Sequence, residues 1–353
     1  MNTRKPQPAT ARPVNPKRRP VAPRPAAQAG DASRPGEPAS RKPGIPPELR
    51  GLRHFLAISD VEPAVLKRLL TFAIERKKTF RQGRLRPALK GKTLGMIFQK
   101  ASLRTRLSFE VAMWQLGGYA INMEDHQVGM GRREAVEDVA RVVSSMCDGI
   151  MARVFAHSYI KSLAKFSRVP VINGLSDESH PCQAGADLMT LIEHFGEIAG
   201  RRLAFVGDGF NVAKSLAWSC AKLGMPFVQA APKRYQLPKA FLDAIRRAVP
   251  DAQLAVTTDP RDAVRGADVV VTDTWTSMGQ EAEKQQRLKD FAGYQVNAKL
   301  LKAAGPEAVV LHCLPAYRNV EITDEVMDGP QSLIFQEAEN RLHFQRALLE
   351  VIL

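Results

Sequence analysis

The sequence predicts an α/β fold: two doubly wound domains with parallel sheets, joined by long helices and preceded by a disordered N-terminal extension. Two observations lead to this fold class. From residue 46 onward, short apolar runs of strand length alternate with segments whose apolar residues recur at helical spacing. The alternation pauses at one long helical segment, 183–195, and then restarts, which indicates two domains.

The N-terminal extension, 1–45, differs from the rest in composition. It holds 10 of the 24 prolines, 10 basic residues and only 2 acidic ones, with almost no large apolar side chains. Burial cannot repay the entropy of ordering such a segment, so we expect it to be disordered. Its prolines exclude the amphipathic helix of a mitochondrial presequence. An inert or weakly anion-binding extension is favoured over an arm that contacts RNA or DNA.

The first domain is expected at 46–185. Its first helix, 61–80, places Val65, Leu66, Leu69 and Leu70 on one face, with Pro63 in the first turn. The elements predicted after it alternate between strand and helix as far as the linking helix: 92–98, 103–116, 119–122, 136–146, 149–154, 159–166 and 169–173.

The second domain is expected at 186–336. Its predicted elements are strands at 203–206, 227–230, 253–257, 269–272 and 308–311, and helices at 211–223 and 238–249. A last helix, 336–352, follows the final strand and has no sheet partner in the sequence.

Composition excludes several classes of protein. The formal net charge is +15, but residues 46–353 carry only +7, so any nucleic-acid binding would belong to the extension. No apolar run is long enough for a membrane span or a secretory signal. The four cysteines have no C-x-x-C spacing, which argues against a disulfide framework or zinc cluster and fits a reducing cytosol.

Residues 102–106 (SLRTR) lie where a predicted strand turns into a helix. Backbone N–H groups at a helix N-terminus attract anions, and two guanidiniums and two hydroxyls add further donors. The segment therefore predicts a phosphate site. A helix-capping serine followed by solvent-exposed arginines would give the same sequence pattern. His180, at the head of the linking helix, is a candidate for proton chemistry at the domain junction, or a structural histidine.

Residues 207–212 (GDGFNV) follow a strand and invite a dinucleotide interpretation. That interpretation fails because Val212 replaces the third glycine and the next strand ends without an acid for a ribose; Lys233 and Arg234 leave a weak case for NADP. Two more polar segments follow apolar strands, 273–281 (DTWTSMGQE) and 312–318 (HCLPAYR). Both are expected at the carboxyl edge of the second sheet, where open α/β folds bind ligands.

Taken together and in this order, these segments resemble the ornithine carbamoyltransferase family. The similarity extends over about 51–349 and includes the stretches ARVVSSM, INGLSD and EAENR, at 140–146, 172–177 and 337–341. It implies a carbamoyl phosphate domain, an ornithine domain, and a last helix, 337–353, that packs back on the first domain. The loop Asp-x-x-x-Ser-Met-Gly is typical of the ornithine enzymes rather than of their aspartate-using relatives.

The resemblance also implies roles for individual residues. The phosphate would be held by Ser102, Arg104, Thr105 and the backbone of Leu103. The carbamoyl group would be bound by Arg153, His180, Gln183 and Arg318. Ornithine would be bound by Asn211, Asp273, Ser277, Met278, Cys313 and Leu314.

Gln127 matches the position that the family sends into a neighbouring subunit's site, which implies a homotrimer or a multiple of one. The chain departs from the family at Leu103, Phe210, Tyr317 and Asn319, and Phe210 beside the ornithine asparagine could reshape the pocket or merely pack.

The expected reaction is attack of the neutral δ-amino group of L-ornithine on carbamoyl phosphate, giving L-citrulline and phosphate. Arg153, His180, Thr105 and Arg318 would stabilise the oxyanion, and no metal or cofactor is expected. We expect a cytoplasmic enzyme of arginine biosynthesis that binds no membrane. Alternatives are a carbamoyltransferase for putrescine or an acylated ornithine, an NADP-dependent oxidoreductase, and a nucleic-acid binder acting through the extension.

Overall fold

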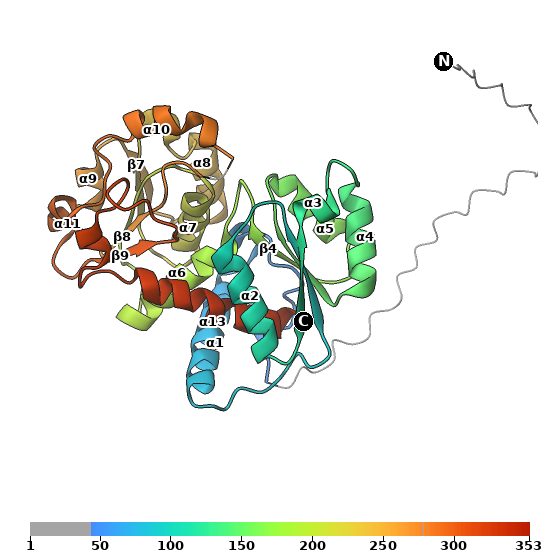
Figure 1. The fold of residues 1–353 in the computed structure, drawn as a ribbon. Coiled ribbons are helices and arrows are strands. Elements are labelled where there is room, and N and C mark those ends of the chain that lie inside the picture. Colours follow the sequence, from blue (N-terminus) through green and yellow to red (C-terminus); the bar gives the residue numbers. More distant parts are fainter. Residues whose placement is uncertain (1–43, 278) are drawn as a thin grey trace, which may run out of the picture. The chain divides into compact units, whose positions relative to one another are not determined.

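The computed structural model describes residues 44–277 and 279–353, which belong to one structural unit built on two parallel sheets (Figure 1). The prediction made for the N-terminal extension, apart from its last two residues, and the one made for Met278 lie outside the described residues. No helix in the described part of the chain is both long and apolar enough to cross a membrane.

The first sheet has four parallel strands in the order β2-β1-β3-β4: β1 (Thr93–Phe98), β2 (Tyr119–Glu124), β3 (Gly149–Arg153) and β4 (Val171–Leu175). Five helices belong to this half: α1 (Pro63–Arg81), α2 (Leu103–Gln115), α3 (Asp125–Val128), α4 (Val136–Met146) and α5 (His157–Phe166). Strands β3 and β4 are buried along their whole length, as expected for parallel strands covered on both faces.

The second sheet has five parallel strands in the order β7-β6-β5-β8-β9: β5 (Leu203–Val206), β6 (Phe227–Ala230), β7 (Leu254–Thr257), β8 (Val269–Thr272) and β9 (Val309–His312). Its helices are α7 (Asn211–Lys222), α8 (Lys239–Ala248), α9 (Pro260–Val264), α10 (Lys284–Asp290), α11 (Ala298–Ala304) and α12 (Asp324–Met327). Short 3₁₀ turns occur at η1 (Pro47–Leu49), η2 (Ile58–Asp60), η3 (Lys233–Tyr235) and η4 (Glu281–Glu283).

The strand order reverses once in each sheet. The chain leaves β1 for β2 on one side and returns to β3 on the other, and it does the same between β5 and β8. At such a switch point the loops after two adjacent strands diverge and leave a crevice at the carboxyl edge. In the first sheet, Ser102 lies in the loop after β1 and Arg153 is the last residue of β3; in the second sheet, Asn211 begins α7 after the loop from β5, and Asp273 directly follows β8.

Two long helices connect the halves. Helix α6 (Pro181–Phe195) follows β4, and α13 (Ile334–Ile352) contacts α1, α2, α6 and the end of β9 (Figure 1). The approach of α13 to α6 requires Gly185, because a Cβ there would lie 2.3 Å from the ring of Phe344. This packing carries the last helix back onto the first half of the chain.

The predicted fold class is confirmed, and the predicted strands and helices agree with the observed ones within a few residues. Among the described residues, helices α3, α9, α10, α11 and α12 were not predicted. They have 4, 5, 7, 7 and 4 residues, too few for an apolar repeat to be recognised. The exact domain boundaries, 185/186 and 336/337, stay predictions.

Candidate active site

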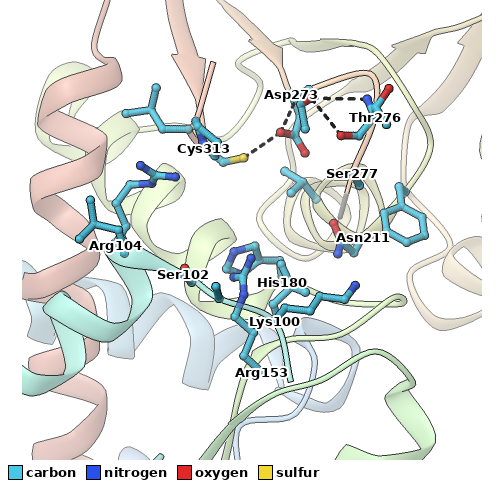
Figure 2. Close-up of a pocket in the computed structure, with 18 of the residues that line it drawn as sticks. Lys100, Ser102, Arg104, Arg153, His180, Asn211, Asp273, Thr276, Ser277 and Cys313 are labelled. Atoms are coloured by element: carbon cyan, nitrogen blue, oxygen red, sulfur yellow. Dashed lines mark hydrogen bonds between the residues drawn. The ribbon is translucent and has the colours of Figure 1, made fainter. Parts of the chain in front are cut away.

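One cavity of about 330 Å³ is lined by residues from both sheets. Its lining comes from the loop between β1 and α2, the ends of β3 and β4, and the starts of α6 and α7. The loops after β8 and β9, and α13, complete it. Figure 2 shows Lys100, Arg153 and His180 in the lower part of the view, Arg104 at the left, and Asp273 and Cys313 in the upper part. The cavity therefore lies between the switch points of the two sheets.

The N-terminus of α2 forms one part of the lining. Ser102 is its N-cap, and its hydroxyl accepts the N–H of Thr105 at 3.3 Å. The side chain of Leu103 is 73% exposed, so only its backbone is suited to ligand binding. Lys100 is buried and its ammonium lies 4.5 Å from the ring centre of Phe155. The predicted anion site is thus assembled, with Lys100 added to it.

Three guanidiniums converge on this side of the cavity: Arg104, Arg153 and Arg341. Arg341 Nη2 donates to Thr105 Oγ1 at 2.7 Å, and Arg153 Nη1 donates to the same oxygen at 3.4 Å. Within residues 44–277 and 279–353, none of the three forms an ion pair with a carboxylate, and the Nε atoms of Arg153 and Arg341 have no hydrogen-bond partner.

The clustering of these three guanidiniums is electrostatically unfavourable when no anion is bound. Burial, together with the positive charges of Arg341 and Arg104, lowers the pKa of Arg153 to about 9. Burial also lowers the pKa of Arg341. Buried charges of one sign without a counter-ion are unfavourable, and a bound dianion would relieve both effects. The arrangement is built for an anion.

His180 is the N-cap of α6 and lines the cavity. Its backbone N–H donates to Ser215 Oγ at 2.9 Å, which fixes the residue against α7. Burial, with help from Arg341 and Arg153, lowers its pKa well below the usual value, so the imidazole is neutral near pH 7. Its Nδ1 is buried without a partner. A neutral ring with an unused nitrogen can bind a polar ligand atom.

The opposite side of the cavity carries a carboxylate and a thiol. Asp273 Oδ1 accepts the backbone N–H of Thr274 at 2.7 Å and the Cys313 thiol at 3.0 Å. Burial, followed by the charge of Asp273, raises the pKa of Cys313 well above its usual value. The thiol is therefore protonated and acts as a hydrogen-bond donor rather than a nucleophile.

Other predicted ornithine-binding residues line the same side: Asn211, Ser277 and Leu314. Asn211 Nδ2 donates to the carbonyl of Ser176 at 2.7 Å, which links α7 to the loop before α6. Phe210 and Tyr317, two of the departures from the family pattern, also line the cavity.

Four predicted site residues lie away from the cavity lining. Gln183 and Thr105 are fully buried behind it. Gln127 is exposed on α3, where its side chain accepts the N–H of Glu124 at 2.8 Å. Arg318 has a side chain that is 39% exposed and pairs with Asp324 at 2.6 Å and Asp328 at 2.7 Å.

Two basic residues of the lining were given no role from the sequence. Arg341 lies in the EAENR stretch, which supported the resemblance without being assigned a role. Lys100 is separated from the SLRTR segment by one residue, Ala101. A basic residue beside a predicted anion site was a usable signal for Lys100. Nothing in the local sequence indicates that α13 brings Arg341 to α2.

The glycine-rich turn after β5 is occupied by protein contacts. A Cβ on Gly209 would lie 2.7 Å from the backbone nitrogen of Leu237, so this glycine allows two backbone segments to approach closely. Asp208 forms a salt bridge of 2.6 Å with Arg287. These contacts give the turn a structural role and no dinucleotide cradle.

Asp273, His312 and Cys313 offer ligand atoms within 4.8 Å of one another, the spacing of a metal site. Both ring nitrogens of His312 are already engaged. Nδ1 accepts the N–H of Leu314 at 2.9 Å, and Nε2 lies 3.2 Å from Glu321 Oε1. A metal would have to break one of these contacts, so the group as arranged does not fit an ion.

Comparison with known proteins gives consistent matches along the chain. Residues 53–193 match the carbamoyl-P binding domain of aspartate/ornithine carbamoyltransferase, and residues 199–352 match its Asp/Orn binding domain. An ornithine carbamoyltransferase of Symbiobacterium thermophilum is 50% identical over 306 residues, which cover 85% of this chain and 98% of that protein. One from Methanosarcina mazei is 48% identical over 297 residues, covering 84% and 98%.

Solved structures agree with the sequence relatives. The ornithine carbamoyltransferase of Pyrococcus furiosus superposes with a TM-score of 0.82 at 45% identity, covering 85% of this chain and 96% of its own. The ornithine carbamoyltransferase of Gloeobacter violaceus gives a TM-score of 0.75 at 44% identity, covering 85% and 98%.

Proposed function

The chain belongs to the aspartate/ornithine carbamoyltransferase family, and we propose that it transfers the carbamoyl group of carbamoyl phosphate to the δ-amino group of L-ornithine, giving L-citrulline and phosphate. The observation that carries this proposal is that one cavity has positive side chains on one side and a negative one on the other. Arg104, Arg153 and Arg341 line the positive side, and Asp273 lines the negative side. A dianionic carbamoyl donor and a cationic amino acid match this distribution of charge.

The cationic side supports binding of carbamoyl phosphate. The phosphate would contact Ser102, Arg104 and the N–H groups at the start of α2, with Lys100 nearby. The carbonyl oxygen would be held by Arg153 and the neutral His180, whose hydrogen bonds strengthen as negative charge develops on that oxygen. Thr105 would act by orienting Arg153 and Arg341, since its hydroxyl accepts from both.

We propose that Arg341 has the role that the resemblance implies for Arg318. Arg341 lines the cavity and has no carboxylate partner among the described residues, whereas the exposed Arg318 is engaged by two aspartates. Arg318 would have to exchange both ion pairs to reach a substrate, so we assign it a structural role in this state of the site.

The acidic side supports binding of ornithine. Asp273 would hold the α-amino group, and Asn211 and Ser277 would bind the amino acid's polar end. Met278 is kept in the proposal from the resemblance alone. Leu314 and Phe210 would line the aliphatic part of the substrate.

The reaction then needs no protein nucleophile. The lone pair of the neutral δ-nitrogen attacks the carbamoyl carbon, a C–N bond forms, and the C–O bond to phosphate breaks with its electron pair leaving on phosphate. The departing phosphate can take the amine proton. The side chains contribute orientation of two substrates and stabilisation of the oxyanion, which together account for large rate accelerations.

We also propose that the enzyme is a cytoplasmic homotrimer that works in arginine biosynthesis. Support for assembly comes from large apolar side chains exposed on the first half of the chain: Leu103, Leu107 and Trp114 on α2, Tyr119 and Ile121 on β2, and Val142 and Met146 on α4. Exposed apolar groups of this size are frequent in protein interfaces. Gln127 lies outside the cavity of its own chain, as expected for a residue given to a neighbour. Sedimentation equilibrium of the purified chain measures the mass of the assembly.

The function is tested by incubating purified protein with carbamoyl phosphate and L-ornithine and measuring citrulline and phosphate together. We expect the two products in equal amounts and only when both substrates are present. Absence of citrulline would refute the proposal. Putrescine and N-acetylornithine serve as competing amines in the same assay. A faster reaction with either would assign the chain to that amine instead.

A further inference from the structure

We propose that Glu337 is a positioning residue that ties the carbamoyl half of the site to the amine half, because its two carboxylate oxygens bind Gln183 and the backbone of His312. This inference rests on the proposed function and adds a component that it does not include. Glu337 touches neither substrate in the proposed arrangement and would act through the groups it holds.

The geometry joins two distant parts of the chain. Glu337 lies in the first turn of α13 and is 1% exposed. Its Oε1 accepts from Gln183 Nε2, one turn beyond His180 on α6. Its Oε2 accepts the backbone N–H of His312 at 3.1 Å, at the end of β9 immediately before Cys313. One carboxylate therefore links the start of α6 to the loop that carries the thiol.

The contacts of Gln183 fix the orientation of its amide. Nε2 donates to Glu337 and to Asp187 Oδ1, the latter at 2.7 Å, so both of its hydrogens are used. Oε1 accepts from Arg341 Nη1 at 2.9 Å. A guanidinium only donates, so the amide cannot be reversed. Gln183 therefore connects Glu337 to Arg341, which lines the cavity.

Asp187 and Glu337 are two buried carboxyl groups that influence each other. Burial raises the pKa of Asp187 to about 7, and burial and the neighbouring Asp187 raise the pKa of Glu337 well above its usual value. Both shifts disfavour a second negative charge on the pair. The other titratable groups that influence the pair come from α13, the loops after β8 and β9, and α7: Arg341, Asp273, Cys313 and Cys220.

Two isosteric variants separate the positioning role of Glu337 from the charge of the Asp187–Glu337 pair, because each variant removes one of the two carboxyl groups and leaves the other. In Glu337→Gln, the single amide oxygen can accept from Gln183 or from His312 but not from both, and the other donor meets an NH₂ group. In Asp187→Asn, the new oxygen can accept from Gln183 while the new NH₂ donates to Glu337, so both links through Glu337 are retained.

We expect Glu337→Gln to raise the KM of carbamoyl phosphate and of ornithine and to lower kcat, with a combined loss of about 5- to 150-fold, the effect of one lost buried hydrogen bond. Asp187→Asn should lose less. The matched control is Glu193→Gln. Glu193 lies on α6, as Asp187 does, and its carboxylate binds Lys77 at 2.8 Å and Asn340 at 2.9 Å without lining the cavity. The Glu193→Gln variant should have a lower Tm and unchanged KM values for both substrates.

Steady-state kinetics and thermal melting of the four proteins decide the question. Kinetic constants for Glu337→Gln equal to those of Glu193→Gln, or a larger loss in Asp187→Asn than in Glu337→Gln, would overturn the inference. If Glu337→Gln does not fold, Glu337→Asp replaces it. It keeps the carboxylate but is one methylene shorter, so it should reach only one of the two partners and raise at least one KM. Unchanged KM values would again overturn the inference. A wild-type chain that makes no citrulline would instead refute the proposed function.

Discussion

The two sides of the cavity differ in how their charges are compensated. On the cationic side, burial lowers the pKa of Arg153 and of Arg341, and the nearby charge of Arg104 lowers both further, with no ion-pairing carboxylate among the described residues. On the acidic side, Asp273 is already satisfied by a backbone N–H and a thiol. The first side is strained until an anion arrives, whereas the second needs no ligand to be stable.

This difference suggests that each side of the cavity binds a different substrate and that the two substrates bind in a fixed order. The guanidiniums gain most from a dianion, so carbamoyl phosphate should bind without ornithine. Asp273 offers one half-buried carboxylate, which gives a smaller gain for a cationic amine. We therefore expect the donor substrate to bind first and to complete the site for the acceptor.

The largest expected effect comes from breaking the cationic side. Arg153→Ala should lower kcat/KM for carbamoyl phosphate about 10²- to 10⁴-fold, because two charge-assisted hydrogen bonds are lost. Arg106→Ala is the matched control, since Arg106 is half-exposed and pairs with Glu110 at 2.9 Å. Steady-state assays compare the two. Equal losses would show that the cavity arginines have no special role.

Substituting Met for Arg341 and, separately, for Arg318 compares an arginine that has no carboxylate partner among the described residues with one that has two. Arg341→Met should lower kcat/KM about 10- to 150-fold, the effect of one charge-assisted hydrogen bond. Arg318→Met should change it by no more than about threefold, since exposed ion pairs contribute little. Kinetics of both variants at saturating ornithine give the answer. A larger loss for Arg318→Met would restore the role that the sequence alone assigned to it.

On the acidic side, Asp273→Asn should raise the KM of ornithine about 10- to 100-fold, because the amide removes the charge that binds an amine. The KM of carbamoyl phosphate should stay nearly constant. Measuring both KM values in one series checks this. Parallel increases in the two would mean that Asp273 shapes the whole cavity rather than one side of it.

The smallest effect is expected at the thiol. Cys313→Ser keeps a donor for Asp273, so activity should fall by about tenfold or less. If Cys313 were a covalent nucleophile, the substitution would abolish the reaction. Activity of the variant, measured from pH 7 to 9, distinguishes the two.

The sequence predicted the fold well because its two sheets have periodic, strongly apolar strands. Ser102, Asp273 and Cys313 could be expected at the cavity because each follows a strand or caps a helix at a carboxyl edge, whereas Arg153, inside a predicted strand, was assigned only through the resemblance. Those positions depend on local order along the chain and on the rule that parallel strands end at one edge.

What the sequence did not reveal depends on packing between distant segments. Arg318 lies close to Cys313 in sequence but turns to the aspartates on and after α12. Arg341 is far away in sequence but is carried to Thr105 by α13. The link through Glu337 joins α6, β9 and α13, and it follows only from how these elements meet.

The proposed function depends on one cavity with separate cationic and acidic sides. Isothermal titration of carbamoyl phosphate, without ornithine, into the wild-type chain, Arg153→Ala and Asp273→Asn tests this arrangement directly. We expect similar affinity for the wild type and Asp273→Asn, and loss of binding in Arg153→Ala. Equal weakening in both variants, or unchanged binding in Arg153→Ala, would contradict it.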